Sequence, residues 1–520
     1  MKKALLTSFA LMLGLAGSAQ TTYFSQTVGT NTAGTVYNSG FASVKTSSGT
    51  FVTVAATNAG GFEVNTFSST GTLMLTTKLA SSVCTIQNVA YASELPDGSI
   101  LVTGTGNASG DVFYIAKINL LTNEVTITYK VAETFSYTKG PRAVYNNGAI
   151  YAAFPQYAKF DLNKFDTDLN PMWSKTCEVD TMTGKNPGND CGILDDTTII
   201  VVGKCDTTLG WGEYDTTGGL DSMRLFGIAG YTRVYGMART ADGNMLLAGF
   251  NQSYSTFSTN PILLKVGAGG NIIWAKIVEA TSLIRFVDVE ELPNGNIIAF
   301  GTSVEAYSDT YFDGAIAFDA SGNLTSAVKF GAGQKIYNLY DVKVYADGLL
   351  MSGVITDNST TTTYNALIYT NFSFGTVCDK TPVTLNASNL AHWETTAIAA
   401  SDVRVNNGIL ATTASYGLMT MGSSQTPEIC SIGTAVEEME TTHASVYPNP
   451  VIAGSTVTIT MSAAGSYTLN VLNAAGALVH TSTANGNAAA INTQNLTTGL
   501  YIVNIYENGV RVSSEKIAVK

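Results

Sequence analysis

The stretch ELPNGNIIAFG at residues 291–301 decides the fold, because close copies of it recur along the chain. ELPDGSILVTG stands at residues 94–104 and TADGNMLLAGF at residues 240–250. In each copy an Asn-Gly or Asp-Gly pair separates two runs rich in aliphatic residues, which is the strongest short-range signal for a β-hairpin. We expect a type I′ turn, in which both central residues need a positive φ. The repeated hairpin predicts an all-β fold.

The same turn recurs eight times between residues 20 and 433, at intervals of 46 to 60 residues. A second hairpin follows in each repeat and is clearest at Gly269-Gly270-Asn271 and Ser321-Gly322-Asn323. Four strands in about 40 to 50 residues are typical of one β-propeller blade. We predict an eight-bladed β-propeller, with seven blades as the alternative because the first and last copies are the most degenerate. The turn copies are Ser48-Gly49, Asp97-Gly98, Asn147-Gly148, Asp196-Thr197, Asp242-Gly243, Asn294-Gly295, Asp347-Gly348 and Asn407-Gly408.

The two strands of the repeated hairpin differ in pattern. The strand before the turn alternates between apolar and charged residues, as in VDVEE at residues 287–291, whereas the strand after it is almost wholly apolar, as in NIIAFG at residues 296–301. Alternation indicates one wet face, and a continuous apolar run indicates burial on both faces. We expect the alternating strand to be the innermost of its blade and to face a central channel.

The ends of the chain differ from the repeats. Residues 1–19 are predicted to be a signal peptide, with two lysines before an apolar run and small residues before the cut. That run is too short to span a bilayer, and no later stretch is long enough for a transmembrane helix. Residues 20–433 are assigned to the propeller and the polar residues 434–446 to a linker. Short alternating strands in residues 447–520 predict a small C-terminal antiparallel β-sandwich.

Charge and cysteine content limit the classes of partner. The chain has 27 basic and 39 acidic residues, a formal net charge of −12, and no cluster of lysines or arginines, so nucleic acid and anionic membrane are poor partners. Six cysteines without CxxC spacing argue against a zinc site. Disulfides are allowed in an exported protein, with Cys177–Cys191 and Cys378–Cys430 as candidate pairs. The alternative is that several cysteines are simply buried small side chains.

Two parts of the chain resemble known families. The phrases LPDGSILVTG, LPNGNIIAFG and NIIWAKI resemble the degenerate β-propeller repeats of secreted bacterial proteins, over residues 21–433. The tail closely resembles the type A C-terminal sorting domain of cargo proteins of the type IX secretion system of Bacteroidota. The matching segments are YPNP at residues 447–450, YTLNVLNAAGALV, NLTTGLYIVNI and the closing EKIAVK.

The resemblance of the tail implies an export route. It implies recognition by the outer-membrane translocon and its sorting machinery, removal of the tail, and a passenger that is secreted or attached to surface lipopolysaccharide. An ordinary carbohydrate-binding sandwich is the alternative. The residues that the resemblance marks as the sorting signal are Tyr447, Pro448, Asn449, Pro450, Gly476, Gly499, Tyr501 and Lys520.

Residues that break the repeat pattern are candidates for ligand binding, because a ligand site adds non-repeating side chains to a repeat scaffold. Trp173 and Trp274 repeat and are expected to pack between blades, whereas Trp211 and Trp393 do not repeat and are expected on loops. Charged residues of the alternating strands are expected to line the channel, although an ordinary solvated face is the alternative. The candidates are Trp211, His392, Trp393, Arg142, Arg239, Asp288, Asp341 and Asp402.

No catalytic set emerges from the sequence. Of three histidines, only His392 falls in the propeller, and the Asp box of bacterial sialidases is absent. The oxygen-bearing residues of DLN at 161–163 and DTDLN at 166–170 alternate as calcium ligands do, but the second segment falls where a hairpin turn is expected. We predict no cofactor, with calcium as the alternative.

Short Asp-Thr/Ser motifs resemble the O-glycosylation sequon of exported Bacteroidota proteins. The acceptor residues would be Thr181, Thr197, Thr207, Thr216 and Ser222.

Together these features indicate a secreted or cell-surface propeller that acts as a binding or adhesion module for extracellular glycan or protein. An extracellular polysaccharide hydrolase or lyase on the same scaffold is the alternative. Two carboxylates about 5 to 10 Å apart in a pocket would favour the enzyme.

Overall fold

The computed structural model describes 23 ranges of the chain, and all its named elements are β-strands. No helix long and apolar enough to cross a membrane occurs within these ranges. The chain divides into two compact units, Met1–Cys430 and Ser431–Lys520. The described residues are 23–31, 41–57, 60–79, 84–108, 110–131, 142–156, 159–178, 190–193, 195–205, 208–228, 230–256, 258–279, 285–302, 313–331, 335–357, 362–377, 380–394, 404–407, 412–417, 419–421, 444–473, 478–507 and 510–520.

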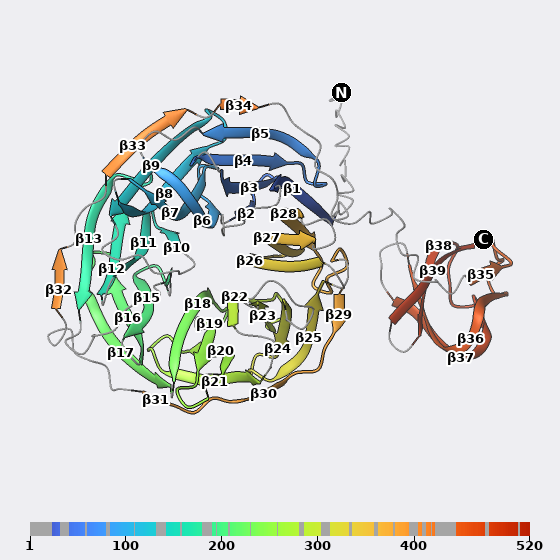
Figure 1. The fold of residues 1–520 in the computed structure, drawn as a ribbon. Coiled ribbons are helices and arrows are strands. Elements are labelled where there is room, and N and C mark those ends of the chain that lie inside the picture. The colour runs from blue at the N-terminus through green and yellow to red at the C-terminus, as the bar shows by residue number, and fades with distance from the viewer. Residues whose placement is uncertain are drawn as a thin grey trace, which may run out of the picture. The chain divides into compact units, whose positions relative to one another are not determined.

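Seven antiparallel sheets in the described part of the first unit are arranged as the blades of a ring (Figure 1). The innermost strand of each blade contacts the innermost strands of both neighbouring blades, so these seven strands close a circle around the ring axis. Each innermost strand precedes one copy of the repeated turn, which confirms the prediction for the alternating strand.

The strands of blades 1 to 6 follow the chain from the axis outward, and blade 7 ends in the N-terminal strand β1. Blades 1 to 3 are β2 (Phe41–Lys45), β3 (Phe51–Ala56), β4 (Phe62–Phe67), β5 (Leu73–Leu79); β6 (Thr85–Glu94), β7 (Ile100–Asn107), β8 (Asp111–Asn119), β9 (Glu124–Val131); and β10 (Arg142–Asn146), β11 (Ala149–Gln156), β12 (Lys159–Phe165), β13 (Pro171–Glu178). Blades 4 and 5 are β14 (Asp190–Ile193), β15 (Thr198–Cys205), β16 (Thr208–Asp215), β17 (Leu220–Ile228); and β18 (Tyr231–Arg239), β19 (Met245–Gln252), β20 (Thr259–Val266), β21 (Ile272–Glu279). Blades 6 and 7 are β22 (Arg285–Glu291), β23 (Ile297–Thr302), β24 (Gly314–Phe318), β25 (Leu324–Phe330); and β26 (Lys335–Tyr345), β27 (Gly348–Asp357), β28 (Thr362–Thr370), β1 (Phe24–Asn31).

The repeated turn differs from the expected type I′ form in most copies. In the loop from Leu292 to Asn296 the first amide donates to the last carbonyl (2.7 Å), and Gly295 alone has a positive φ, of 81°. This is a type I turn followed by a left-handed glycine. The loop is one residue longer than a type I′ turn, and it closes the hairpin with a single left-handed residue. Among the described copies only Asn147-Gly148 has a positive φ at both residues.

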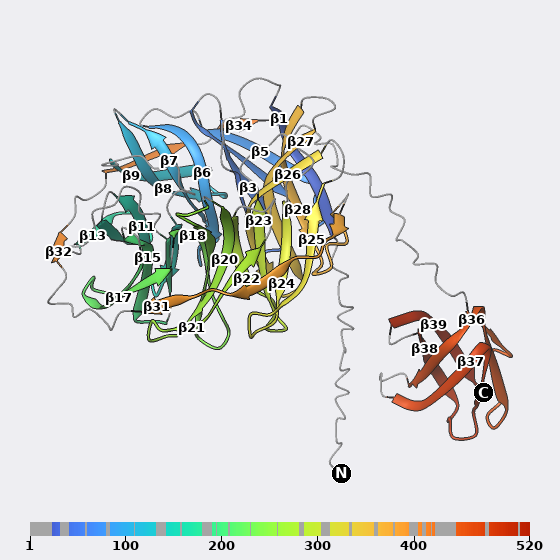
Figure 2. The ribbon, with the colours of Figure 1, turned by 60° about the horizontal axis from the view of Figure 1, so that its bottom comes forward.

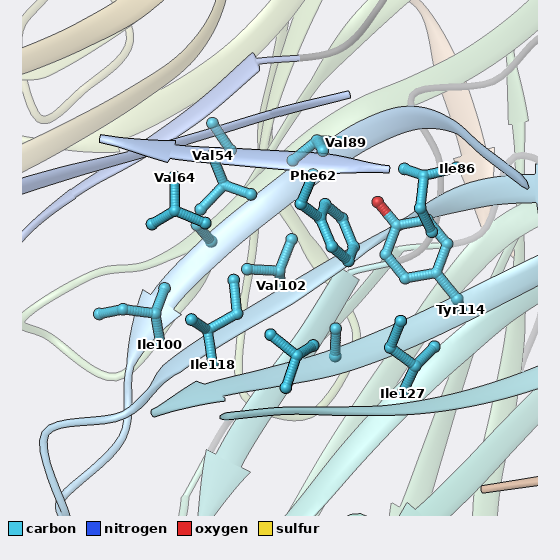
Figure 3. Packing of buried hydrophobic residues seen from close by; sticks show 14 of the residues in the cluster. Val54, Phe62, Val64, Ile86, Val89, Ile100, Val102, Tyr114, Ile118 and Ile127 are labelled. Carbon is cyan, nitrogen blue, oxygen red and sulfur yellow. The ribbon is translucent and has the colours of Figure 1, made fainter. Parts of the chain in front are cut away.

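The hydrophobic core is divided into seven clusters, each lying between two adjacent blades. Between blades 1 and 2, for example, Phe62 and Val64 pack against Val102 and Tyr114 (Figure 3). Full burial of a side chain of this kind contributes about 1.5 to 3 kcal/mol. Because every one of these clusters takes side chains from two blades, no blade has a core of its own within the described residues, as in other repeat folds.

The tryptophans predicted to pack between blades do so. Trp274 lies against Gly322 in the turn of the next blade, where an added Cβ would lie 2.9 Å from the indole, and its Nε1 donates to the Ala320 carbonyl (3.3 Å). Trp173 lies in the same way against Gly218 of blade 4. The prediction from their equivalent positions in the repeat is confirmed.

The ring is closed where blade 7 meets blade 1. β1 pairs antiparallel with β28, with Phe24 opposite Tyr369, so the N-terminal strand completes the last blade. Beside this ladder, the Lys45 ammonium of blade 1 contacts the Asp347 carboxylate (2.7 Å) and the Tyr369 hydroxyl (2.8 Å) of blade 7. Backbone pairing and side-chain contacts together therefore join the ends of the blade series.

After blade 7 the chain runs back around the outside of the ring, as the orange strands show (Figures 1 and 2). Six short strands pair antiparallel with the outermost strands of blades 6, 5, 4, 3, 2 and 1, in that order. We call these six strands the belt: β29 (Lys380–Pro382), β30 (Asn386–Asn389), β31 (His392–Glu394), β32 (Arg404–Asn407), β33 (Thr412–Gly417) and β34 (Met419–Met421).

The belt explains the number of blades. The eighth copy of the repeated turn, Asn407-Gly408, begins at the last residue of β32, which pairs with β13 on the outside of blade 3. This copy therefore belongs to the belt and not to a further blade. The described sheets correspond to the seven-bladed alternative, and eight turn copies overstate the number of blades by one.

The second unit is a small antiparallel sandwich that closes toward a barrel. The register of β36 breaks between Thr460 and Gly465, so its first part pairs with β35 and β37 and its second part with β37 and β38. Tyr467, Leu469 and Val503 lie in a core that belongs to this unit alone. The strands are β35 (Ala444–Tyr447), β36 (Thr456–Leu472), β37 (Leu478–Asn492), β38 (Gly499–Glu507) and β39 (Val510–Val519).

Candidate binding surface

The residues predicted to form one binding site lie in different environments, and Trp211 is the clearest correction. It is not on a loop but in the middle of β16, with 0% of its surface exposed. It packs in the core between blades 4 and 5, and its Nε1 donates to Glu213 Oε1 (2.8 Å). The flanking glycines suggested a loop, but Gly212 instead accommodates the Tyr214 ring, 3.0 Å from where a Cβ would lie. Trp211 is therefore withdrawn as a ligand contact.

His392 and Trp393 lie in the belt, on the outer edge of blade 4. In β31 they pair with Ile228 and Gly227 of β17, at the edge of the sheet opposite the axial strand β14. The His392 side chain is exposed, with Nδ1 3.0 Å from the Leu390 carbonyl oxygen. The Trp393 side chain lies outside the described residues. These two residues and the axial residues do not form a common site, because they occupy opposite edges of the blades.

Three of the predicted charged residues do come together at the ring axis. Arg142, Asp288 and Asp341, from blades 3, 6 and 7, interact through one group of side chains, whereas Arg239 is exposed at the end of β18 and Asp402 lies outside the described residues. We call this group the axial cluster; its members are Tyr91, Arg142, Asp288, Glu290, Asp341 and Lys343.

The cations of the axial cluster connect blades that are not neighbours in sequence. The Arg142 guanidinium lies 4.9 Å from the Tyr91 ring centroid and donates to the Met237 carbonyl. The Lys343 ammonium lies 5.0 Å from the same ring and donates to the Ser43 carbonyl (2.8 Å). Two cations from blades 3 and 7 thus share one tyrosine of blade 2, which holds the innermost strands together.

The carboxylates of the axial cluster are occupied by internal bonds. Asp288 accepts hydrogen bonds from the amides of Val289 and Val342 (both 3.1 Å), the second of which belongs to the next blade. Asp341 pairs with Lys343, and burial of that lysine is outweighed by Asp341 and nearby tyrosines, which raise its pKa. With 3% and 2% of their surfaces exposed, Asp288 and Asp341 serve the fold and do not offer a substrate a pair of open carboxylates.

Glu290 differs from these two carboxylates. It is half-buried, and its pKa is raised to about 8 by burial and then by the negative charge of Asp288, against the opposing effect of Arg142 and Lys343. At neutral pH it is therefore mostly protonated. A neutral Glu290 adds no charge to the axis, where Asp288 and Asp341 already balance the two cations.

A second group of side chains lies on the rim of the ring where β18 begins and β19 ends. Tyr231, Arg233 and Tyr235 alternate along β18, and Phe250 of β19 lies opposite Arg233 in register. The Phe250 ring centroid is 5.9 Å from that of Tyr231 and 5.9 Å from that of Tyr235, with interplanar angles of 34° and 24°. Three rings therefore form a row, with Phe250 in the middle.

An arginine lies over each outer ring of this row. Arg233 is 5.3 Å from the Tyr231 ring centroid, and Arg285 of blade 6 is 5.0 Å from that of Tyr235. The Nε atoms of both arginines are buried and find no hydrogen-bond acceptor within the described part of the chain. The row thus spans the joint between blades 5 and 6. We call it the aromatic–arginine patch: Tyr231, Arg233, Tyr235, Phe250, Tyr254 and Arg285.

The patch is reached by solvent. Tyr254, on the turn after β19, is 57% exposed, and the other five side chains are half-buried. Burial raises the pKa of Tyr231, which Arg233 partly opposes, so this phenol stays protonated and can donate a hydrogen bond. Half-buried rings beside arginines provide stacking faces and directed donors, the two components of a polar ligand site.

This patch was not predicted, although its signal is present in the sequence. YTRVYGMAR at residues 231–239 alternates with period two, which places Tyr231, Arg233 and Tyr235 on one face of an innermost strand. The non-repeating Trp211, by contrast, is a core residue. At Tyr235 the register of β18 shifts, and such bulges often re-aim a side chain next to a functional site.

In the C-terminal unit, the predicted sorting motif is tied to the last strand. The side-chain amide of Asn449 donates from Nδ2 to the Lys516 carbonyl (2.7 Å), and its Oδ1 accepts from the backbone amide of Ala518 (3.0 Å). Lys520 donates its amide to the Val451 carbonyl (2.8 Å), and the Tyr501 hydroxyl donates to Thr497 (2.8 Å). YPNP and the end of the chain therefore form one edge of this unit. Of the other marked residues, Gly499 begins β38, Tyr447 is 79% exposed and Gly476 lies outside the described residues.

The two segments considered for calcium have other uses. Asp161 and Asn163 are buried in β12 and bind the Lys130 ammonium of blade 2, with a Lys130 Nζ to Asp161 Oδ2 distance of 2.7 Å. Asp166 accepts from the amides of Asp168 (2.9 Å) and Asn170 (2.8 Å), which confirms the turn interpretation. Within the described residues no group of three or more His, Cys, Asp or Glu side chains could hold a metal ion.

Only some of the residues predicted for glycosylation and disulfide formation lie within the described part of the chain. Thr197 is exposed between β14 and β15, where its hydroxyl donates to Asp195 (2.8 Å), and it stays a predicted acceptor. Thr216 and Ser222 are half-buried, whereas Thr181 and Thr207 lie outside the described residues. The side chains of the two predicted cysteine pairs also lie outside them. Cys84 is buried, which raises the pKa of its thiol to about 11.

Comparison with known proteins settles the role of the C-terminal unit. Residues 445–520 match the secretion system C-terminal sorting domain. The protein is therefore a cargo of the type IX secretion system, and it is located on the cell surface or outside the cell.

Two solved structures show a distant likeness to this chain. No curated protein matches this chain. A fungal alcohol oxidase of the AA5 family in complex with copper is 13% identical, with a TM-score of 0.44, and the match covers 92% of this chain and 96% of that chain. PorZ, a surface component of the type IX secretion system of Porphyromonas gingivalis, is 10% identical, with a TM-score of 0.21 and coverage of 93% and 81%. Likeness at this level says nothing of what this chain binds.

Proposed function

We propose that the propeller is a non-catalytic binding and adhesion module, which the type IX secretion system places outside the cell to engage an extracellular glycan. The observation that carries this proposal is the row of Tyr231, Phe250 and Tyr235 on the rim between blades 5 and 6. Aromatic faces held side by side offer a sugar ring its apolar face while hydroxyls and arginines bind its polar edge. Protein ligands use tyrosine and arginine as well, and they are an outcome of the test.

The fixed geometry of the row supports a binding role. Each outer ring contacts both Phe250 and an arginine, so it is already ordered before a ligand arrives. A preorganised site loses less side-chain entropy on binding. The rim is also where a propeller displays non-repeating residues on a rigid scaffold.

The alternative of a polysaccharide hydrolase or lyase has less support. An enzyme of that kind needs two carboxyl groups that reach the scissile bond. Asp288 and Asp341 are buried and bonded within the fold, and only Glu290 of the axial carboxyl groups is half-exposed. The axial cluster is thus better suited to joining the blades than to acting on a substrate.

The proposal is tested by applying the exported protein to an array of extracellular glycans, with a hydrolysis screen in parallel. Tyr231→Ala and Tyr235→Ala are each expected to weaken binding roughly tenfold or more, since an aromatic residue at the centre of an interface contributes about 2 kcal/mol. Phe372→Ala, which removes an exposed ring from blade 7, is the matched control and should bind as the wild type does.

Three results would contradict the proposal. Unchanged binding by the Tyr231→Ala/Tyr235→Ala double variant would remove the patch from the site. Binding to proteins but to no glycan would change the ligand class. Turnover of a polysaccharide that is lost in Glu290→Gln would favour the enzyme.

A further inference from the structure

We infer that the aromatic–arginine patch binds an acidic glycan, with Arg233 and Arg285 holding the carboxylate of a uronic acid. This inference rests on the proposed function and names the chemical class of its ligand. The observation behind it is that both guanidinium groups lie at the ends of the ring row and that their buried Nε atoms have no acceptor within the described residues.

These two arginines differ from the buried lysines of the ring, although the buried Nε atoms of Arg142 and Arg224 also have no acceptor within the described residues. Lys130 pairs with Asp161 (2.7 Å) and Lys265 with Asp242 (2.6 Å), and Lys343 pairs with Asp341. In the described part of the chain no acidic side chain pairs with Arg233 or Arg285. In an acidic protein of net charge −12, two guanidinium groups that have no acidic partner among the described residues favour the binding of an anion.

The chemistry of the arginines favours a carboxylate in particular. Nε and one terminal nitrogen of a guanidinium donate in parallel to the two oxygens of a carboxylate. Within the described residues the two Nε atoms have no acceptor, and a buried donor without an acceptor costs free energy. A ligand carboxylate would supply the missing acceptor, whereas a neutral sugar offers only single hydroxyl oxygens.

The rings and the arginines together fit one sugar unit. A uronic acid carries its carboxylate at the edge of the pyranose ring, so the ring can stack on Tyr231 or Tyr235 while the carboxylate points to the side. Each of these tyrosines has its own arginine, at 5.3 and 5.0 Å from the ring centroid. The row therefore offers two stacking positions, each beside a guanidinium, as a chain of repeating uronic acids requires.

The test compares acidic oligosaccharides with carboxyl-reduced forms of the same backbone, using oligomers of galacturonate, of mannuronate and guluronate, and of glucuronate. Titration of the exported protein should give at least one acidic oligomer that binds tenfold or more tightly than its reduced form. Arg233→Gln and Arg285→Gln should each lower the affinity for the acidic oligomer about tenfold and leave the affinity for the reduced form unchanged. Arg239→Gln, an exposed arginine on the same strand, is the control and should behave as the wild type.

The outcomes separate the two proposals. If a neutral glycan binds through the tyrosines and no acidic oligomer is preferred, or if the arginine variants do not lose the preference, the inference is overturned and the proposed function stands. If no glycan of either kind binds, both fail. Melting temperatures of the variants near that of the wild type show that a lost preference is not lost folding.

Discussion

The joints between blades and the belt around them hold the same ring by different means. At the joints, side chains make the contacts: seven apolar clusters, and polar bridges such as Lys130 to Asp161. In the belt, backbone ladders make them, through strands of only three to six residues whose described side chains are mostly exposed. The joints thus depend on which side chain stands at each position, and the belt depends on the presence of an extended chain.

The two devices solve different problems. Apolar clusters join the flat faces of the blades, but they leave the outer edge of every sheet with unpaired amides and carbonyls. The belt covers six such edges, and β1 is the outer strand of blade 7. Substitution of single side chains should therefore affect the joints strongly and the belt weakly, whereas removal of chain should affect the belt.

The largest effect is expected from deletion of residues 380–421. Six sheets would lose a strand, and at about 1 kcal/mol for each net hydrogen bond the loss amounts to several kcal/mol. We expect the melting temperature to fall by roughly 10 °C or more and the protein to self-associate through open edges. Calorimetry and light scattering measure both effects. As a control, removal of residues 444–520, a unit with its own core, should leave the melting temperature of the passenger unchanged. An unchanged melting temperature after deletion of the belt as well would show that the belt does not stabilise the ring.

The next effect concerns the joint between blades 2 and 3. Lys130→Met would leave the Asp161 carboxylate buried without its cation, which costs about 3 to 5 kcal/mol. Denaturant unfolding should show this loss, and the double variant Lys130→Met/Asp161→Leu should recover most of it. Lys117→Met at the same joint is the control, since its partner across the joint, Asp168, is 79% exposed and its partner in its own blade, Asp97, is half-exposed; it should cost about 1 kcal/mol or less. Equal losses at the two lysines would mean that burial does not decide the strength of a joint.

A third test compares two turn glycines that differ only in their surroundings. Gly270 has φ of 72° and lies against blade 4, where a Cβ would be 2.8 Å from Arg224 and 3.0 Å from Trp211. Gly295 has φ of 81° and open space around it. Alanine at either position costs about 1 kcal/mol through the left-handed backbone. Gly270→Ala should cost a further 1 to 3 kcal/mol, roughly, because the joint must open. Equal unfolding free energies for the two variants would show that the joint can yield.

The smallest effect is the pH dependence of the axial cluster. The pKa of Glu290 is raised from 4.5 to about 8 in the folded protein, so its contribution to stability is full below pH 4.5 and is lost as the pH rises through 8. The groups facing it are Asp288 on its own strand, Arg142, and Asp341 and Lys343. Since solvent reaches Glu290, we expect an effect of about 1 kcal/mol.

The measurement is the melting temperature of Glu290→Gln, which mimics the protonated form, relative to the wild type. Between pH 5 and pH 9 the wild type should lose roughly 2 to 4 °C against this variant. For Glu279→Gln, at an exposed glutamate of β21, the plot of melting temperature against pH should run parallel to that of the wild type. Parallel curves for Glu290→Gln as well would show that this carboxyl is ionised in the folded state.

The joints were predictable from sequence because side chains carry them. Runs such as NIIAFG gave the buried second strands, and the equivalent positions of Trp173 and Trp274 gave their packing between blades. The axial placement of Arg142, Asp288 and Asp341 followed from alternation, although not their bonds to Met237, Val342 and Lys343, which need the register of neighbouring blades.

The belt was not predictable for the complementary reason. Segments such as KTP, NASN and HWE pair through backbone groups that every residue has, and the alternation of Val383, Leu385 and Ala387, which pack against the core between blades 5 and 6, spans only a few residues. The copy of the turn at Asn407-Gly408 was therefore counted as a blade. The prediction that Trp211 lies on a loop was wrong for another reason. The glycines beside it suggested a loop, but they allow close packing within a strand.

The backward course of the belt also has a mechanical meaning. The belt ends at β34 on blade 1, so a pull on the chain beyond it would load β34 first, then β33 on blade 2, and so on to β29 on blade 6. The strands would detach one at a time, each at a low force, and residues 380–421 would extend by roughly 140 Å at about 3.4 Å per residue before the blades bear the load. A surface protein held by this end would yield in steps under shear while its ring, and whatever the rim has bound, stays intact.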